Sequence, residues 1–476
     1  MTWCLFAAGP VFGFAALKPV LISEGVYSDV CPDGGLCDER DLKFNFMFAL
    51  SAVVTNATAF IVGSILDSFG PRVTGIIGSF IIAFAALCLA YGSVITIVDA
   101  YLLGYVSLAF GGPFVFISCF QLANSFPGHS GLVLALLTGC FDTSSALFMF
   151  YRVAYQNSLV KNFTMYKFFT AYLVVPLFIL ICQLFIMPHH SYKTIQTLAK
   201  IGETGIDETG LPVNPEDNRY DPQQVDQLER TRSHLSIRSS KSVYEEIADI
   251  RLNDKSGGIH GILHGKSPRE QMRTPWFWLM CLFTTIQMLR INYFLATIRT
   301  QMTWYFDSES AAITVNKFFD LALPLGGVIS IPFIGLILDN LQTVTTLHIL
   351  LVTSAIIGFA GLSSYQFVQV LGICLLVVYR PFYYTAVSDY CAKVFGFETF
   401  GTVYGTIICF SGLCNMAQSY LDRLTMLQFN KDPNPVNIAL LALTVLFGGS
   451  MLGYVKGQER KLKRQAVIAE AMGLLT

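Results

Sequence analysis

Apolar stretches long enough to cross a lipid bilayer fill most of this chain and constrain its fold more than any other feature. A helix needs about 20 apolar residues to span the hydrocarbon core of a membrane, and the chain is 53% hydrophobic and 13% charged. The sequence therefore predicts an all-α membrane protein and excludes a soluble enzyme. We expect twelve spans, at residues 1–23, 42–66, 73–96, 99–123, 131–151, 168–188, 275–299, 312–338, 344–364, 367–390, 397–420 and 437–456.

A long polar segment divides the spans into two groups of six. It is mixed in charge and poor in apolar periodicity, which is typical of a disordered linker. The usual polar leader before the first span is missing, so we expect either an abrupt start at the first helix or a shortened sequence. The predicted units are a six-helix bundle at 1–188, a cytosolic disordered linker at 189–272, a second six-helix bundle at 273–456 and a cytosolic basic tail at 457–476.

Charges in the short loops predict the orientation, because Lys and Arg favour the cytosolic side. A dense basic cluster follows the last span, at Lys456, Arg460, Lys461, Lys463 and Arg464. It puts the C-terminus in the cytosol, and an even number of spans then puts the N-terminus there too. The acidic first loop and the glycosylation sequon at Asn162 fit outer loops. Basic residues around that sequon argue the other way, but they are less dense than the cluster in the tail.

Two cysteines, Cys31 and Cys37, lie close together in the polar first loop. They form either a small loop disulfide or two free thiols. The formal net charge of −1 gives no reason to expect a nucleic acid partner. We also find no metal-ligand spacing, nucleophile elbow or phosphate loop, so no metal, cofactor or catalytic residue is expected.

One five-residue sequence motif occurs twice, as Gly-Ser-Ile-Leu-Asp at 63–67 and Gly-Leu-Ile-Leu-Asp at 335–339. The first copy continues to Gly70 and Arg72, and this turn resembles the G-x-x-x-D-x-x-G-x-R loop motif of the major facilitator superfamily. The resemblance implies two six-helix bundles and a latch on the cytosolic side. Asp67 can sit against a helix N-terminus or pair with an arginine, and Gly63 permits close helix packing. The second copy keeps Gly335 and Asp339 but lacks the later Gly and Arg, so we expect a weaker latch there.

Four charged residues stand out within the predicted spans, where such residues are costly and normally face a cavity or a partner. Lys18, Arg290 and Arg380 fall in spans one, seven and ten, which line the central cavity in the superfamily. We expect them to hold an anionic group such as a carboxylate, unless Asp142 pairs with one of them and the set only fixes helix packing. Further candidates for substrate binding are the nearby polar and aromatic residues Asn292, Tyr383, Tyr384, Gln121 and Asn415.

Three stretches resemble a narrower family, the sodium-independent, system-L-type amino-acid transporters of solute carrier family 43. These are Asp67 to Arg72, Gln287 to Phe294, which contains Arg290, and Lys393 to Gly405 at the start of span eleven. The chain as a whole is similar to the fungal branch of that group. The resemblance implies alternating-access movement of large neutral amino acids, with the vacuolar membrane or the plasma membrane as the location.

The residues leave the transport mode open. Asp142 leaves room for proton coupling, but uniport is favoured over proton symport because no second carboxylate clearly faces the same cavity. One alternative is a proton-coupled carrier of another small organic anion. Another is a membrane sensor that keeps the fold without moving a solute. The expected partners are a small-molecule substrate and the lipid bilayer, and the sequence does not define an oligomeric state.

Overall fold

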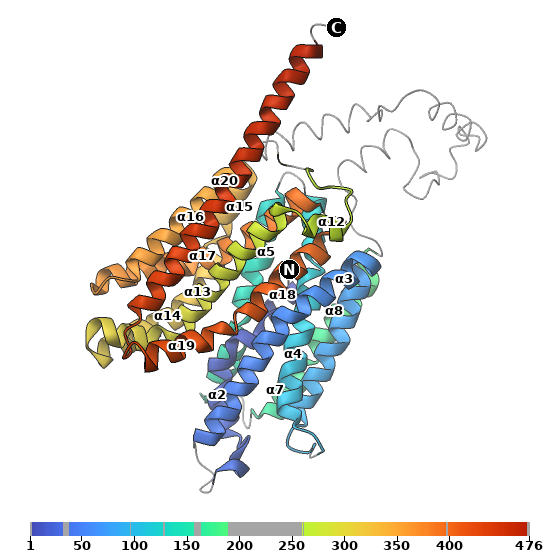
Figure 1. Cartoon of the computed structure of the whole chain (residues 1–476). Coiled ribbons are helices and arrows are strands. Elements are labelled where there is room, and N and C mark those ends of the chain that lie inside the picture. The colour runs from blue at the N-terminus through green and yellow to red at the C-terminus, as the bar shows by residue number, and fades with distance from the viewer. Residues whose placement is uncertain are drawn as a thin grey trace, which may run out of the picture.

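The computed structural model describes residues 2–31, 38–95, 97–126, 129–156, 163–188, 259, 261–396 and 398–473. All regular secondary structure within these ranges is helical (Figure 1). Ten helical segments are long and apolar enough to cross a membrane, and the one at Leu42–Ala90 contains two of the predicted spans. The first predicted span is shorter and broken, with its apolar part at Pro10–Ser23.

The N-terminal half contains the helices of the first six predicted spans. They are α1 (Thr2–Ala7), η1 (Pro10–Gly13), α2 (Phe14–Ser23), η2 (Ser28–Val30), α3 (Asp38–Ala90), α4 (Ala100–Ile117), η3 (Phe120–Ser125), α5 (Ser130–Ser144), α6 (Ala146–Gln156), α7 (Met165–Tyr172) and α8 (Val174–Phe185).

The C-terminal half contains the other six spans and a short helix before them. Its helices are α12 (Pro268–Met272), α13 (Pro275–Phe306), α14 (Glu309–Ile329), α15 (Ile331–Asn340), α16 (Thr343–Ala360), α17 (Gln366–Phe395), α18 (Phe400–Cys414), α19 (Ala417–Leu427) and α20 (Asn434–Gly473).

Two predicted spans, 42–66 and 73–96, are joined without a loop in the 53-residue helix α3. Gly70 has φ 79° and ψ 174°, a conformation that breaks the helix and that a residue with a Cβ rarely adopts. Pro71 follows, at the start of the next helical run, where its missing N–H leaves no helical acceptor unsatisfied. The turn motif is thus a sharp break between two membrane-spanning helices.

The prediction of a disordered linker up to residue 272 is wrong for its last part. The backbone N–H groups of Gly261 and Leu263 donate to the carbonyls of Lys393 and Val394, at 3.0 and 3.2 Å. The side-chain amide of buried Gln271 donates to the carbonyls of Leu263 and Phe395, both at 2.9 Å. This part of the chain is therefore docked on the end of α17. The rest of the expected linker, apart from Ile259, lies outside the described residues.

The two halves meet mainly through helices of the second, fifth, eighth and eleventh spans. Helix α18 packs along α3, and α5 packs against α14, α15 and α17. We call the end of the molecule with Asp67 and Asp339 the motif end. The opposite end is the far end, where the Tyr27 hydroxyl donates to Asp99 Oδ2 at 2.8 Å. The halves lie together at the motif end and diverge toward the far end, where α13 and α19 lie apart from α2 and α7 (Figure 1).

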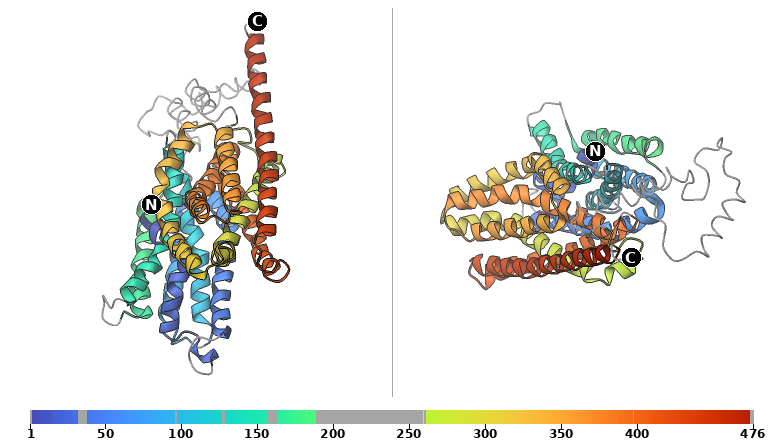
Figure 2. Two further views of the ribbon diagram at one scale, coloured as in Figure 1. Left: turned by 90° about the vertical axis from the view of Figure 1, so that its left-hand side faces the viewer. Right: turned by 90° about the horizontal axis from the view of Figure 1, so that it is seen from above.

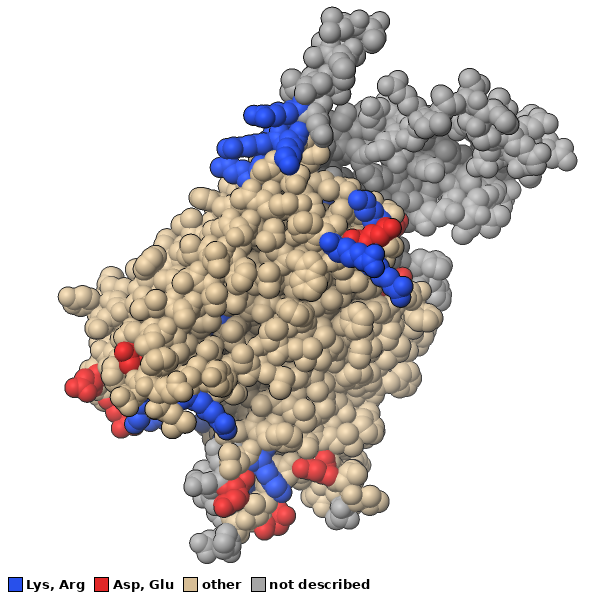
Figure 3. Space-filling view, viewed as in Figure 1, with Lys and Arg blue, Asp and Glu red and all other residues tan. Residues whose placement is uncertain are grey.

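Helix α20 continues past the predicted span end at residue 456 to Gly473 without a break. It projects from the motif end as one straight rod (Figure 2). Lys and Arg side chains gather where this rod leaves the bundle, whereas Asp and Glu side chains gather at the far end with a few basic ones (Figure 3). The basic segment predicted as a tail is therefore an extension of the last membrane helix.

Candidate functional site

At the motif end, Asp67 of the N-terminal half caps a helix of the C-terminal half. Its two carboxylate oxygens accept the backbone N–H groups of Gly401 and Thr402, at 2.9 and 2.6 Å. These N–H groups belong to the first turn of α18, where they have no partner inside the helix. The negative charge also lies at the positive end of the helix dipole. The carboxylate thus bridges the two halves.

Asp339 makes the same contact in the opposite direction. Its oxygens accept the backbone N–H groups of Gly131 and Leu132 at the start of α5, at 2.7 and 3.2 Å. Each half therefore supplies one aspartate to the N-terminus of one helix in the other half. We expected a weaker second latch from its shorter motif, but the same two contacts are present in both copies.

Glycines allow the helices to approach closely at these latches. A Cβ at Gly63 would lie 1.8 Å from the carbonyl oxygen of Gly401, and a Cβ at Gly335 would lie 2.7 Å from the Leu132 side chain. Arg72 donates through Nε to the carbonyl of Met187 at 2.6 Å. The arginine of the motif thus holds the end of the sixth span within its own half.

Aromatic rings from both halves pack together next to the first latch. Phe120 of η3 lies 5.6 Å from Phe400 and 5.4 Å from Tyr404, measured between ring centroids, in edge-on geometry. The sequence did not single out these three rings, although Phe400 and Tyr404 lie within a stretch that carries the family resemblance. Next to Phe120, Gln121 is buried, and its amide nitrogen and oxygen have no hydrogen-bond partner among the described residues.

Near the middle of the spans, a buried ion pair also joins the two halves. Arg380 Nη1 lies 3.3 Å from Asp142 Oδ1, and the side chains are 10% and 4% exposed. Asp142 lies midway along the helical segment Ser130–Gln156, and Arg380 lies midway along α17. This pair was one of the two arrangements that the sequence left open for Asp142. Arg380 Nε has no hydrogen-bond partner among the described residues, so the cation keeps binding capacity.

The two tyrosines after Arg380 have different surroundings. Tyr383 is fully buried, and its hydroxyl donates to the backbone carbonyl of Thr284 on α13 at 2.7 Å. Tyr384 lies beside Arg380 and Asp142 and packs 4.7 Å from the Tyr383 ring. Tyr384 is therefore the tyrosine placed next to the ion pair, whereas Tyr383 fixes the packing of α17 against α13.

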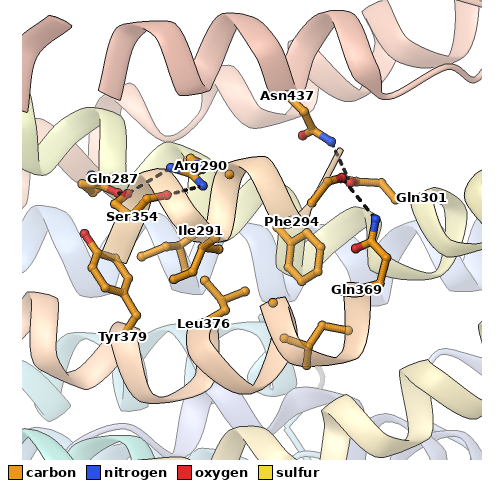
Figure 4. A pocket seen from close by; sticks show the side chains of 15 residues that line it. Gln287, Arg290, Ile291, Phe294, Gln301, Ser354, Gln369, Leu376, Tyr379 and Asn437 are labelled. Atoms are coloured by element: carbon orange, nitrogen blue, oxygen red, sulfur yellow. Dashed lines mark hydrogen bonds between the residues drawn. The ribbon is translucent and has the colours of Figure 1, made fainter. Parts of the chain in front are cut away.

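Arg290 lies in a different environment, in a pocket lined by residues of the C-terminal half alone (Figure 4). Its Nη1 and Nη2 donate to the hydroxyl and the backbone carbonyl of Ser354 on α16, at 2.9 and 2.8 Å. The pocket is lined by residues of α13, α16, α17 and α20 and by Gly361, without Arg380 or Asp142. The expectation that Arg290 and Arg380 share one cavity is therefore wrong for this conformation.

The other predicted residues are scattered over the molecule. Lys18 is half-buried and donates to Asn45 Oδ1 at 3.3 Å, near the start of α3. Asn292 is half-buried on α13. Asn415 ends α18, and its Oδ1 is a buried atom without a hydrogen-bond partner among the described residues. The structure thus brings Arg380, Asp142 and Tyr384 together and leaves Lys18 with a separate partner.

Two predictions concern residues at the edges of the described ranges. Cys31 is disulfide-bonded, while Cys37 lies outside the described residues, so the pairing of these two cysteines stays a prediction. Asn162 also lies outside them. Within the described part of the chain, no group of three or more His, Cys, Asp or Glu side chains could hold a metal ion.

Solved structures of known transporters have the same fold as this chain. The proton:xylose symporter XylE matches with a TM-score of 0.56 and 14% identity, over 96% of this chain and 94% of its own. The human organic anion transporter MFSD10 matches with a TM-score of 0.57 and 12% identity, over 95% and 98%. With the paired latch, these matches show that the chain has the fold of the major facilitator superfamily.

Several known proteins are similar to this chain in sequence. Protein FMP42 of Saccharomyces cerevisiae is 53% identical over 470 residues, which cover 96% of this chain and 93% of the relative. Equilibrative nucleobase transporter 1 of Bos taurus is 25% identical over 93% of this chain and 92% of its own length. The human large neutral amino acids transporter small subunit 3 is 26% identical over 32% of this chain and 30% of its own. No family model matches the chain. At its identity and coverage, Protein FMP42 shows that the chain belongs to the same family as that protein. The apolar helices and the fold are those of an integral, multi-pass membrane protein.

Proposed function

We propose that this transporter is a uniporter for small solutes that are polar but carry no net charge, with large neutral amino acids as the first candidates. The observation that supports this proposal is the buried Asp142–Arg380 pair between the two halves. It offers one negative and one positive group a few ångströms apart. A zwitterionic amino acid presents the complementary arrangement, with its carboxylate toward Arg380 and its ammonium toward Asp142.

Such a ligand resolves an energetic difficulty of the ion pair. Separating two buried opposite charges costs several kcal/mol, because each is left without its partner in a medium of low dielectric constant. A zwitterion replaces both partners at once, so the halves can move apart while both charges stay paired. Tyr384 lies beside the pair, where its ring can contact the ammonium group or the side chain of the solute.

A carrier for a small organic anion is less consistent with this geometry. Asp142 already neutralises Arg380, and Arg290 and Lys18 lie in other surroundings. An anion would therefore meet a site without net positive charge. Proton symport would require Asp142 to take up a proton during the cycle, and the neutral carboxyl would no longer form the ion pair with Arg380.

Nucleobases are a second candidate. The bovine relative named for equilibrative nucleobase transport aligns over 92% of its length, whereas the human relative named for large neutral amino acids aligns over 30%. A nucleobase is neutral and planar, and its edge carries both hydrogen-bond donors and acceptors. A carboxylate and a guanidinium can bind such an edge through the same atoms that would bind a zwitterion.

Counterflow uptake distinguishes these solutes. The purified full-length chain is reconstituted into liposomes preloaded with unlabelled leucine, isoleucine, phenylalanine or adenine, and uptake of the labelled form is measured with and without a pH gradient. Accumulation of an amino acid without a gradient supports the proposal, and accumulation of adenine alone supports the second candidate. Uptake that requires the pH gradient contradicts uniport. Counterflow of none of the four, from folded protein, contradicts both and leaves the organic anion carrier or the sensor.

Single substitutions then test the role of the pair. Asp142→Asn removes the negative charge with little change in shape, and Arg380→Lys keeps the positive charge but loses the two-pronged geometry. Both should lower counterflow by at least about tenfold. The matched control is Arg299→Gln, which changes an exposed arginine on α13 that pairs with Glu309. Normal uptake by both pair variants would remove Asp142 and Arg380 from the site.

We also propose that the motif end and both termini face the cytosol, and that residues 1–188 and 273–456 form the two bundles that rock during transport. The cluster of basic residues where α20 leaves the bundle supports this orientation. The vacuolar membrane and the plasma membrane are both compatible with this orientation.

A fluorescent protein fused to the C-terminus shows in which membrane the protein resides, and the accessibility of this tag to protease in intact and permeabilised cells shows the orientation. Digestion of the tag from the non-cytosolic side would overturn the proposed topology.

A further inference from the structure

The pocket around Arg290 contains a half-buried cation with no anionic partner among the residues that line it. Arg290 lies midway along the 32-residue helix α13, and both of its described hydrogen bonds go to neutral oxygens of Ser354. None of the fifteen lining residues is an aspartate or a glutamate. An uncompensated charge at this depth of a membrane protein is costly, so a counter-ion would stabilise the pocket.

The pocket also has an excess of hydrogen-bond donors. A guanidinium has five N–H groups, and the described bonds of Arg290 use two of them. The side-chain amide oxygen of Gln287 accepts from Ser354 at 2.9 Å. Its amide nitrogen is buried without a hydrogen-bond partner among the described residues, and the residue as a whole is 1% exposed. Gln287 and Arg290 lie one helical turn apart on the same face of α13 (Figure 4).

The pocket has room for a small ligand. Its volume is about 50 Å³, and one water molecule needs roughly 10–15 Å³. A small anion therefore fits, together with water molecules around it. Water alone leaves the charge of Arg290 uncompensated, whereas a small anion both accepts hydrogen bonds and neutralises it.

We propose that this pocket is a binding site for a small inorganic monovalent anion such as chloride, held by Arg290 and the side-chain amide of Gln287. The site lies within the C-terminal half, so the anion can stay bound while the two halves move relative to each other. Tyr379 lines the pocket, and the next residue, Arg380, pairs with Asp142. Occupancy is thus expected to stabilise α17 at the place where it carries the transport pair. The proposal does not depend on which solute is transported.

Thermal unfolding of the purified full-length protein in detergent tests the site directly, with the intrinsic tryptophan fluorescence as the signal. Sodium chloride is titrated against sodium gluconate at constant ionic strength, so that the identity of the anion changes and the ionic strength does not. We expect the Tm to rise with chloride and to saturate, because a ligand that binds only the folded state stabilises it. Bromide should act like chloride. An identical Tm in chloride and gluconate at every concentration would overturn the proposal.

Two variants test whether the rise of the Tm with chloride comes from this pocket. Arg290→Gln should abolish the difference between chloride and gluconate, whereas Arg299→Gln, an exposed arginine on the same helix, should keep it. If Arg290→Gln does not fold, Gln287→Leu removes one donor and keeps the volume similar. It should weaken the apparent chloride affinity by about tenfold. An unchanged chloride dependence in Arg290→Gln, or in Gln287→Leu where that variant replaces it, would place the anion elsewhere and refute the assignment.

Discussion

The carboxylate of Asp67 should control how often the motif end opens, and Asp67→Ala tests this most directly. The substitution removes the acceptor of the Gly401 and Thr402 backbone N–H groups, at 2.9 and 2.6 Å. These groups have no acceptor inside α18, because they belong to its first turn. Alanine also removes a negative charge from the positive end of the helix dipole. The closed arrangement of the motif end should therefore lose stability relative to open ones.

The size of the effect follows from the number and kind of bonds. A hydrogen bond to a charged group contributes about 1.5–3 kcal/mol. Two such bonds on one carboxylate are not fully additive, since both depend on the same desolvated group. We therefore expect a loss of about 3 kcal/mol. This corresponds to roughly a 100-fold increase in the open population, at 1.4 kcal/mol per factor of ten.

Hydrogen–deuterium exchange read by mass spectrometry measures this population at the amides concerned. Peptides that contain Gly401 and Thr402 should exchange about 100-fold faster in Asp67→Ala than in the wild type. Asp67→Asn keeps one acceptor oxygen and should lie between the two. Peptides from α16, which is remote from the latch, serve as the internal reference.

Asp339→Ala is the matched variant at the second latch and decides how the two latches are coupled. If the halves close as rigid bodies, each variant should speed exchange at both helix starts, around Gly401 and around Gly131. If each latch opens alone, each variant should act only on its own helix. Exchange at Gly401 and Thr402 that changes by less than about threefold in Asp67→Ala would refute the reasoning, because the bonds would then contribute under about 0.7 kcal/mol.

Three further predictions use the same structure. A Cβ at Gly63 would lie 1.8 Å from the Gly401 carbonyl oxygen, so Gly63→Ala should destabilise closure by about 1–3 kcal/mol and speed exchange at the start of α18; unchanged exchange would contradict the close contact. Arg380→Ala leaves Asp142 buried without its partner and should lower the free energy of unfolding by about 3–5 kcal/mol. The double variant Asp142→Leu, Arg380→Leu should recover much of the Tm but no counterflow. Recovery of transport in the double variant would exclude the pair from the site. Gln271→Ala removes the hydrogen bonds to Leu263 and Phe395, so the amides at 261–266 should exchange about tenfold faster. Lys266→Ala, at an exposed residue, is the control. Equal exchange in both variants would show that Gln271 does not hold this segment.

Much of the fold could be predicted because the bilayer fixes the length of each helix. A rise of 1.5 Å per residue and a hydrocarbon core about 30 Å thick require spans of about 20 apolar residues. Local hydropathy carries no information on tertiary contacts, however. It therefore missed the docking of residues 261–272 on α17 and the continuation of α20 past residue 456.

The position of the charged residues along their helices was predictable from the sequence, but the direction in which their side chains point was not. Membership in a cavity-lining span does not say which face of the helix carries a side chain. We therefore expected Arg290 and Arg380 to share one cavity, although the Arg290 side chain points to Ser354 of α16. The positions of its neighbours gave a usable signal. Gln287, Arg290 and Phe294 are three and four residues apart and share one face, and all three line the pocket.

The two latches show which part of the repeated motif is needed for the contact between the halves. The second copy lacks the later glycine and arginine, yet Asp339 binds two N–H groups as Asp67 does. Gly70 serves a different purpose, since it provides the positive φ that breaks α3 within one residue. After Asp339 the chain instead leaves the helix through Leu341 and Gln342, both in extended conformations, so no glycine is required. Arg72 binds Met187 within its own half. The aspartate and the small residue four positions before it therefore suffice for the latch, while the other two motif positions shape and anchor the first turn only.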